Sequence, residues 1–158
     1  MLNIKPNKTT IMKTAGILIL SIIAFAIATA MNPVKPVPGP DELKIDFHTG
    51  TWNEALQLAK EQNKPVFLDL STSWCGYCKR MKANVFTDAG VAGYYNSTFI
   101  NVSLDAEKGE GVQLARKYGV RGYPTFVFLN PDGSLAKQSA GYQNPEKFLE
   151  LAKSLKND

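Results

Sequence analysis

The residues of this chain best suited to chemistry are its two cysteines, Cys75 and Cys78, the only two in 158 residues. Gly76 and Tyr77 separate them. Two thiols at this spacing can close a small disulfide ring and reopen it without rearranging the rest of a protein, which thiol–disulfide exchange requires. The spacing therefore indicates a redox-active pair.

The segments on either side of the pair favour the same chemistry. An apolar run predicts a buried strand over 66–71 that leads into the motif, and residues 79–86 predict a helix that leaves it. Cys75 then lies at a helix N-terminus, where unpaired backbone N–H groups and the helix dipole favour a thiolate. We expect Cys75 to be exposed, and Cys78, one turn further along, to be more buried.

Other roles for a Cys-x-x-Cys pair stay open from the residues alone. Structural zinc needs four ligands, but the chain has no further cysteine and one histidine, His48. A static disulfide is an alternative, although so short a loop constrains the unfolded chain little. Copper(I) binding is another, because Met81 supplies a soft thioether close after Cys78.

The N-terminal segment 1–30 predicts export. It has a basic start, an apolar middle and a small-residue end, formed by Lys5, Lys8 and Lys13, the run 15–30, and Ala28-Thr29-Ala30. This order is typical of a secretory signal peptide, cleaved here after Ala30. An apolar run extended over 14–31 approaches the ~20 residues of a membrane span, so an uncleaved anchor is the alternative. A lipid anchor is excluded because no cysteine lies near position 30.

The next segment, 31–41, predicts a stiff extended linker, because it carries four prolines in the stretch 32–40. We expect one folded domain over 42–158. The three lysines of 1–30 account for three of the four net positive charges, which leaves +1 for the remainder. That balance offers no basic stripe for nucleic acid.

Alternating strands and helices predict an α/β sandwich around a mixed sheet. A capping box of Thr51 and Glu54 begins the first helix, and Gly119 is the expected C-cap of a later one. The expected elements are a short strand 43–47, a helix 51–63, the strand 66–71, the motif helix, a helix from 87, a strand 98–104, a helix 110–118, strands 125–129 and 134–140, and a helix 144–156.

Two separated motifs carry a family resemblance. Trp74-Cys75-Gly76-Tyr77-Cys78-Lys79, then Gly122-Tyr123-Pro124-Thr125 before an apolar strand, resembles the thioredoxin fold over nearly all of 43–158. The stretches 64–70 and 85–91 are most similar to the periplasmic C-terminal thioredoxin-like domain of the disulfide reductase DsbD and to its stand-alone exported relatives. The resemblance implies a periplasmic thiol–disulfide oxidoreductase without a cofactor.

The resemblance also implies roles for individual residues. Cys75 matches the nucleophilic cysteine, Cys78 the resolving cysteine, and Asp69 the buried acid behind the motif. Desolvation should raise the pKa of Asp69, which makes it a candidate proton acceptor for Cys78. The alternative for Asp69 is a partly exposed aspartate at a strand end.

A docking surface is implied around the motif. Pro124 matches the family's cis-proline, and a cis Tyr123–Pro124 bond would turn the Tyr123 backbone toward an incoming peptide. Trp74 and Tyr77 would form an apolar rim around Cys75, with ordinary packing as their alternative role.

Two positions depart from the family pattern. Asn101 stands where thioredoxin has a lysine near the buried acid, and Lys82 stands where the DsbD-like domain has a second acid. A cation in place of a carboxylate favours the thiolate and changes the redox potential. We expect a monomeric reductant or electron relay, soluble or tethered to the inner membrane, that acts on protein disulfides and is recharged by an upstream thiol donor. The alternatives are a disulfide isomerase, suggested by Gly76-Tyr77, and a non-catalytic copper(I) protein.

Overall fold

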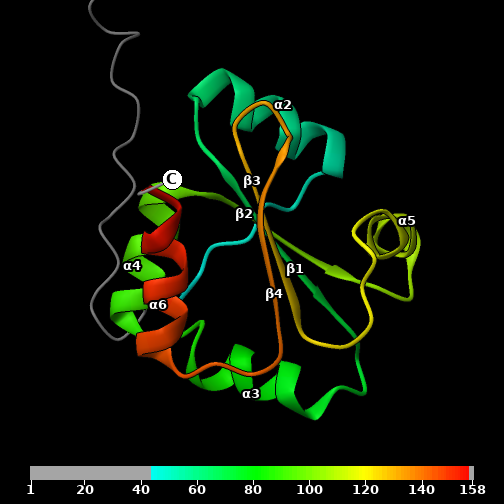
Figure 1. Cartoon of the computed structure of the whole chain (residues 1–158), viewed down its shortest axis with the longest axis vertical. Coiled ribbons are helices and arrows are strands. Elements are labelled where there is room, and N and C mark those ends of the chain that lie inside the picture. Colours follow the sequence, from blue (N-terminus) through cyan, green and yellow to red (C-terminus); the bar gives the residue numbers. More distant parts are fainter. Residues whose placement is uncertain (1–43, 157–158) are drawn as a thin grey trace, which may run out of the picture. The chain divides into compact units, whose positions relative to one another are not determined.

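The computed structural model describes residues 44–156. Four strands form one mixed sheet in the order β2-β1-β3-β4 (Figure 1). Strand β1 pairs in parallel with β2 and antiparallel with β3, which pairs antiparallel with β4. The strands are β1 Val66–Ser71, β2 Ile100–Asp105, β3 Thr125–Leu129 and β4 Leu135–Ala140.

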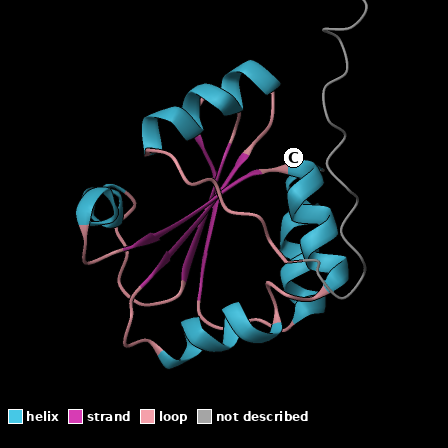
Figure 2. Cartoon of the chain, turned by 180° about the vertical axis from the view of Figure 1, so that it is seen from behind, coloured by secondary structure: helices cyan, strands magenta, loops and turns pink. Residues whose placement is uncertain are grey.

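Helices cover both faces of the sheet. One core cluster joins α2 and α5 to the sheet, and a second cluster joins α3, α4 and α6 to its other face (Figures 1 and 2). The predicted α/β sandwich with a mixed sheet is confirmed. The helices are α2 Trp52–Gln62, α3 Gly76–Asn84, α4 Ala89–Thr98, α5 Gly109–Lys117 and α6 Pro145–Lys153, with a 3-10 turn η2 at Ser154–Lys156.

Strand β1 supplies side chains to both clusters, because successive residues of a strand point to opposite faces. Val66, Leu68 and Leu70 belong to the cluster under α2 and α5, whereas Phe67 belongs to the cluster under α3, α4 and α6. Asp69 shares the parity of Phe67 and therefore lies on that second face. All six residues of β1 are buried.

Local signals begin and end the helices as expected at several positions. The Thr51 side chain accepts the Glu54 N–H, and the Glu54 carboxylate accepts the Thr51 N–H at 2.7 Å, so the predicted capping box is confirmed. Asp88 and Asn144 are the N-caps of α4 and α6. The C-cap of α5 is Tyr118 rather than the expected Gly119, which follows it with φ of +60°, a conformation that favours glycine.

Four expected elements differ from the structure. Residues 44–47 of the expected strand 43–47 form no strand, because the segment is held by single backbone bonds, such as that from Ile45 to the Phe86 carbonyl at 2.8 Å. Strand β2 begins at Ile100 rather than 98, since α4 continues to Thr98. The motif helix spans Gly76–Asn84 rather than 79–86, and the last α-helix ends at Lys153 rather than at 156.

The expected signal peptide or anchor 1–30, the linker 31–41 and the first residues of the expected domain 42–158 lie outside the described residues. Within 44–156, none of the helices combines the length and the apolar character that crossing a membrane demands.

Candidate active site

Cys75 lies between the end of β1 and the start of α3, and Cys78 lies in the first turn of α3. The two form a disulfide with Cα atoms 5.3 Å apart. Cys75 is the N-cap of α3, and its Sγ accepts the backbone N–H of Cys78 at 3.1 Å. Cys75 N–H in turn donates to the Thr72 carbonyl at 3.3 Å, which fixes the turn that leads from β1 into the motif. The Cys75 sulfur therefore sits at the positive end of a helix dipole.

The exposure of the two cysteines differs from the expectation. Cys75 is 5 % exposed and Cys78 is 2 % exposed, so Cys75 is buried rather than open to solvent in the disulfide form. The ring folds the Cys75 sulfur back onto the first turn of α3, where it meets the Cys78 N–H. The order of burial is as expected, but the contrast is small.

Asp69 lies deep in the sheet, two residues before β1 ends. It is 1 % exposed, and its neighbours in register are Ser103 on β2 and Phe126 on β3. The alternative of a partly exposed strand-end aspartate is therefore wrong. Desolvation by burial is the main cause that raises the pKa of Asp69, from 3.8 to about 6. A carboxyl with that pKa can hold or release a proton near neutral pH.

Three groups partly offset the burial of Asp69. The Ser103 hydroxyl donates to Asp69 Oδ2 at 2.8 Å and is the largest of the influences that lower the pKa of Asp69. The Lys82 cation and a hydrogen bond with the Ser71 side chain lower this pKa further. Ser71, Lys82 and Ser103 also line a hollow of about 210 Å³ beside the motif. The partners of the buried acid thus connect it to a polar surface hollow.

Asn101 lies on the same face of β2, but its contacts are elsewhere. Its side-chain N–H groups donate to the Asp46 carbonyl at 3.3 Å and to Asn96 Oδ1 at 3.2 Å. The cation that acts on Asp69 instead comes from Lys82 of α3. With Asn101 on β2 and Lys82 on α3, the positive charge near Asp69 therefore comes from the motif helix and not from the strand.

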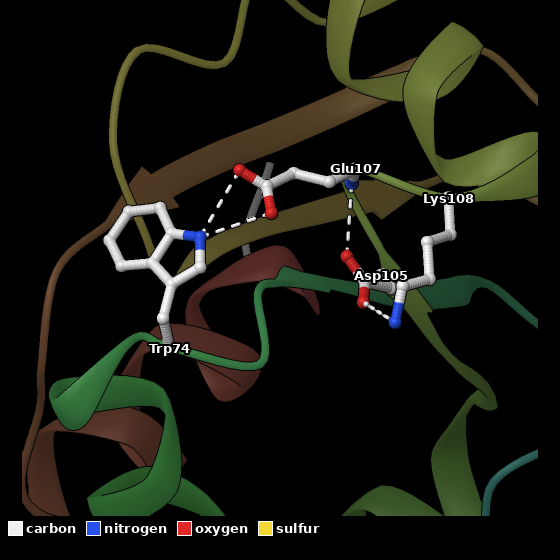
Figure 3. A network of polar contacts seen from close by, with 4 residues as sticks. All are labelled: Trp74, Asp105, Glu107 and Lys108. Atoms are coloured by element: carbon white, nitrogen blue, oxygen red, sulfur yellow. Dashed lines mark hydrogen bonds and ion pairs between the residues drawn. The ribbon is translucent and has the colours of Figure 1, made fainter.

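Trp74 and its partners form the first flank of the disulfide. Trp74 is 64 % exposed, and its Nε1–H donates to both carboxylate oxygens of Glu107, at 3.0 and 3.1 Å (Figure 3). Its indole meets the Tyr123 ring edge to face at 5.9 Å. Glu107 is steadied by its own N–H, which donates to Asp105 Oδ1 at 3.0 Å, and Asp105 pairs with Lys108 at 3.4 Å (Figure 3).

Tyr77 and its partners form the second flank. Tyr77 is 58 % exposed, and its ring lies 6.3 Å from that of Tyr142. The Arg80 guanidinium lies over the Tyr142 ring at 4.6 Å and 6.0 Å from the Tyr77 ring. Both Trp74 and Tyr77 are thus surface rings next to the cysteines rather than interior packing.

The segment that leads into β3, residues 122–125, lies next to the motif. The Tyr123–Pro124 peptide bond is cis, and Pro124 is buried. The Pro124 carbonyl accepts the Gly141 N–H at 2.8 Å, and the Thr125 hydroxyl donates to the Gly122 carbonyl at 2.7 Å. These bonds hold the segment against the end of β4, and the Trp74–Tyr123 contact brings it beside the motif.

Residues 52–156 match the family of thioredoxin-like domains. The chain belongs to this family. A solution structure of a proposed disulphide-isomerase from Bacteroides thetaiotaomicron is 40 % identical, with a TM-score of 0.66 over 73 % of this chain and 95 % of that one. The oxidised C-terminal domain of DsbD from Neisseria meningitidis is 26 % identical, with a TM-score of 0.57 over 70 % of this chain and 97 % of that one.

The chain is also similar to the thiol:disulfide interchange protein DsbD of Yersinia pestis. The two are 32 % identical over 96 residues, which cover 59 % of this chain but 16 % of that protein. These relatives and the Cys-x-x-Cys pair support the assignment of this thioredoxin-like chain as a thiol–disulfide oxidoreductase.

Four residues of this thioredoxin-like site were not identified from the sequence: Ser103, Glu107, Arg80 and Tyr142. Each acts through a partner distant in sequence, as Glu107 does through Trp74, or through a ring contact that only the fold creates. Met81, the third ligand in the copper(I) alternative, is fully buried in the core cluster under α3, α4 and α6. Within the described residues, no group of three or more histidine, cysteine or acidic side chains is arranged to hold a metal ion.

Proposed function

We propose that this chain is an exported thiol–disulfide oxidoreductase whose Cys75–Cys78 dithiol reduces protein disulfides or relays electrons to them. The observation that carries the proposal is the place of Cys75 at the N-cap of α3, where its sulfur accepts the Cys78 N–H at 3.1 Å. In the reduced protein the same N–H and the helix dipole stabilise a Cys75 thiolate.

The exchange proceeds in two balanced steps. The Cys75 thiolate attacks one sulfur of the partner's disulfide, so that a Cys75–partner disulfide forms and the partner's other sulfur leaves as a thiolate. The Cys78 thiolate then attacks Cys75 Sγ, which releases the second partner thiolate and closes the Cys75–Cys78 disulfide seen in the structure. Two electrons pass to the partner, and a dithiol donor returns the chain to its reduced form.

Asp69 takes the proton of Cys78 in the second step. Its burial and its pKa of about 6 support this role, because a carboxylate with a raised pKa is a better base than an ordinary surface aspartate. Ser103 donates a hydrogen bond to the carboxylate, the Lys82 cation acts on it electrostatically, and both residues line the hollow through which its proton can reach solvent.

Trp74, Tyr77, Tyr123 and Pro124 contact the partner. The two exposed rings support this role, since large exposed aromatic side chains are the usual anchors of protein interfaces. The partner's segment lies between them, in strand-like pairing with the Tyr123 backbone.

The proposed location is the periplasm, as a monomer that is either soluble or tethered to the inner membrane. The signal-like segment 1–30 and the similarity to DsbD support this placement. The partners are protein disulfides and an upstream thiol donor. Fractionation of cells that express the full chain, with and without alkaline extraction of membranes, tests both the compartment and the tether.

A disulfide isomerase is the second candidate, favoured by the 40 % identity to the proposed disulphide-isomerase of Bacteroides thetaiotaomicron. An isomerase recovers activity of a scrambled ribonuclease at a fixed glutathione potential, and it needs only catalytic amounts of reduced protein. A reductase consumes one equivalent of donor per disulfide. The two activities of the purified full chain, measured side by side, separate the candidates.

The Cys78→Ala variant tests the proposed function. Mixed with an oxidised protein such as insulin, it should accumulate a covalent Cys75–partner complex that a reducing agent dissolves. The Cys75→Ala variant is the matched control and should form none. A complex that forms equally with Cys75→Ala, or no complex with either variant, would contradict the proposal.

A further inference from the structure

The helix that carries the cysteine pair is cationic and has no acid of its own. Its residues, Gly76–Asn84, include Lys79, Arg80 and Lys82 and no aspartate or glutamate. Lys82 acts on Asp69 in the interior of the site. Lys79 and Arg80 are exposed. The surface beside the disulfide is therefore positive on this side.

Arg80 is held in place in a way that Lys79 is not. Its guanidinium lies over the Tyr142 ring at 4.6 Å and near Tyr77 at 6.0 Å, whereas no ring contact of Lys79 occurs among the described residues. Tyr142 is partly buried and packs against the core cluster under α3, α4 and α6, so it is a fixed platform. A guanidinium stacked on an aromatic face keeps the N–H groups along its edge free for a carboxylate.

The charge of Arg80 is not neutralised within the described residues. The ion pair there joins Lys108 and Asp105, on the other flank of the disulfide. Glu107 on that flank is occupied by the Trp74 indole. A preorganised guanidinium next to a reactive disulfide, without a carboxylate of its own, is complementary to an acidic side chain on whatever docks there.

We infer that Arg80, stacked on Tyr142, selects protein substrates that carry a carboxylate a short distance from their reactive cysteine. The inference rests on the proposed function, because it concerns the partner bound to Cys75. Arg80 follows Cys75 by five positions, which is about 7.5 Å along a helix axis. An extended peptide spans that length in two or three residues. Tyr77, between the cysteines in sequence, has an exposed ring whose centroid is 6.0 Å from the Arg80 guanidinium.

Two peptides test the inference. Each carries one cysteine in a disulfide with neutral 2-thiopyridine; one has glutamate two residues away on both sides of the cysteine, and the other has glutamine there. Cys75 thiolate attacks the peptide sulfur, a Cys75–peptide disulfide forms, and pyridine-2-thione leaves with a measurable absorbance. The rate of each peptide with the reduced full chain is divided by its rate with dithiothreitol, which removes differences in intrinsic reactivity.

The measured quantity is the ratio of these two corrected rates, glutamate over glutamine, so that a change in Cys75 reactivity cancels. We expect the wild-type chain to prefer the glutamate peptide by about two- to fivefold at low salt, the range of a well-formed ion pair at a surface. Arg80→Gln should bring the ratio close to one. Arg80→Glu should instead prefer a third peptide, with lysine at the same positions, over the glutamine peptide.

Lys79→Gln is the matched control, because it removes the same charge from the neighbouring position without removing a stacked group. It should keep most of the preference, and Tyr142→Leu should lower the preference by removing the platform. Equal loss in Lys79→Gln and Arg80→Gln, or a wild-type ratio of one, would overturn the inference alone. If the wild-type chain reacts with neither peptide, or if the Cys75→Ala variant reacts as fast as the wild-type chain, the proposed function is contradicted as well.

Discussion

Each face of the sheet carries a buried core cluster, and the two clusters differ in chemistry. Under α2 and α5 the strands contribute aliphatic side chains, such as Val66, Leu68 and Val127. Under α3, α4 and α6 they contribute aromatic rings, with Phe67, for example, 4.9 Å from Tyr95 in an edge contact. The second face also holds Asp69, at 1 % exposure.

Strand β1 shows the contrast most directly, because it builds both faces from alternate residues. Leu68 and Asp69 are neighbours on the chain, and both are buried. The leucine stabilises the fold wherever it packs, whereas a buried carboxylate costs free energy unless its environment is used. The difference indicates that the aliphatic face is scaffold, and that stability is given up on the face beside α3, where the cysteines lie.

The largest effect on stability should come from the aliphatic face. Leu68→Ala removes a fully buried side chain and should lower the free energy of unfolding by about 2–5 kcal/mol. Denaturant unfolding of the oxidised protein measures the loss. The rate of disulfide exchange per folded molecule should change less than about twofold, because Leu68 packs in the cluster under α2 and α5 and the cysteines are not part of that cluster. A collapse of that rate at conditions where the variant is folded would break the distinction between the faces.

Asp69→Asn should raise stability and slow disulfide exchange, the reverse of what is expected for Leu68→Ala. Below about pH 4 the carboxyl is protonated in both the folded and the unfolded state, so it costs nothing. Between about pH 4 and 6 the unfolded chain ionises first, and stability falls as pH rises; above the folded pKa of about 6 the full penalty is present. A rise of the pKa from 3.8 to about 6 corresponds to about 3 kcal/mol, so the variant should be more stable than wild type by up to that amount at pH 8 and by little at pH 4.

The same variant should slow the second step of exchange. Loss of the proton acceptor should reduce release of the mixed disulfide by about 10²-fold near neutral pH, with recovery as pH rises and Cys78 ionises unaided. Stopped-flow release of the partner thiol measures this step. A variant that gains stability and turns over at the wild-type rate would show Asp69 to be a structural feature only.

Ser103→Ala should produce a smaller change on the same face. The variant removes the 2.8 Å hydrogen bond to a buried carboxylate and should cost about 1.5–3 kcal/mol at pH 8. The cost should shrink at pH 4, where the carboxyl is neutral. Because the bond lowers the pKa of Asp69, its loss should raise that pKa further, which titration of the side-chain carboxyl by NMR would follow. Equal destabilisation at both pH values would argue against a specific role for this bond.

Much of the fold could be predicted from the sequence because its signals are local. The Thr51–Glu54 box and the apolar run over 66–71 depend on neighbours a few positions apart, and both are present in the structure. The expected strand 43–47 is not formed by residues 44–47, because a short stretch of sequence does not reveal whether a partner strand exists. In residues 44–47 the Ile45 N–H donates to the Phe86 carbonyl and the Asp46 N–H donates to the Asn96 side chain instead.

The site was predictable where a motif carries it and hidden where the fold assembles it. Cys75, Cys78 and Asp69 follow from one strand–loop–helix stretch. Ser103 becomes a partner of Asp69 only through the register of β1 with β2, and Glu107 reaches Trp74 across 33 positions. Neither registers nor ring contacts are encoded in the spacing of nearby residues.

The central claim is that Cys75 is the nucleophile, with a lowered pKa, and Cys78 the resolving thiol. Alkylation of the reduced full chain with iodoacetamide at a series of pH values, followed by mass spectrometry of each cysteine, tests it directly. The account predicts that Cys75 is modified first, with an apparent pKa well below the ~8.5 of a free thiol, while Cys78 reacts slowly. Preferential modification of Cys78, or a Cys75 pKa at or above the free value, would contradict it.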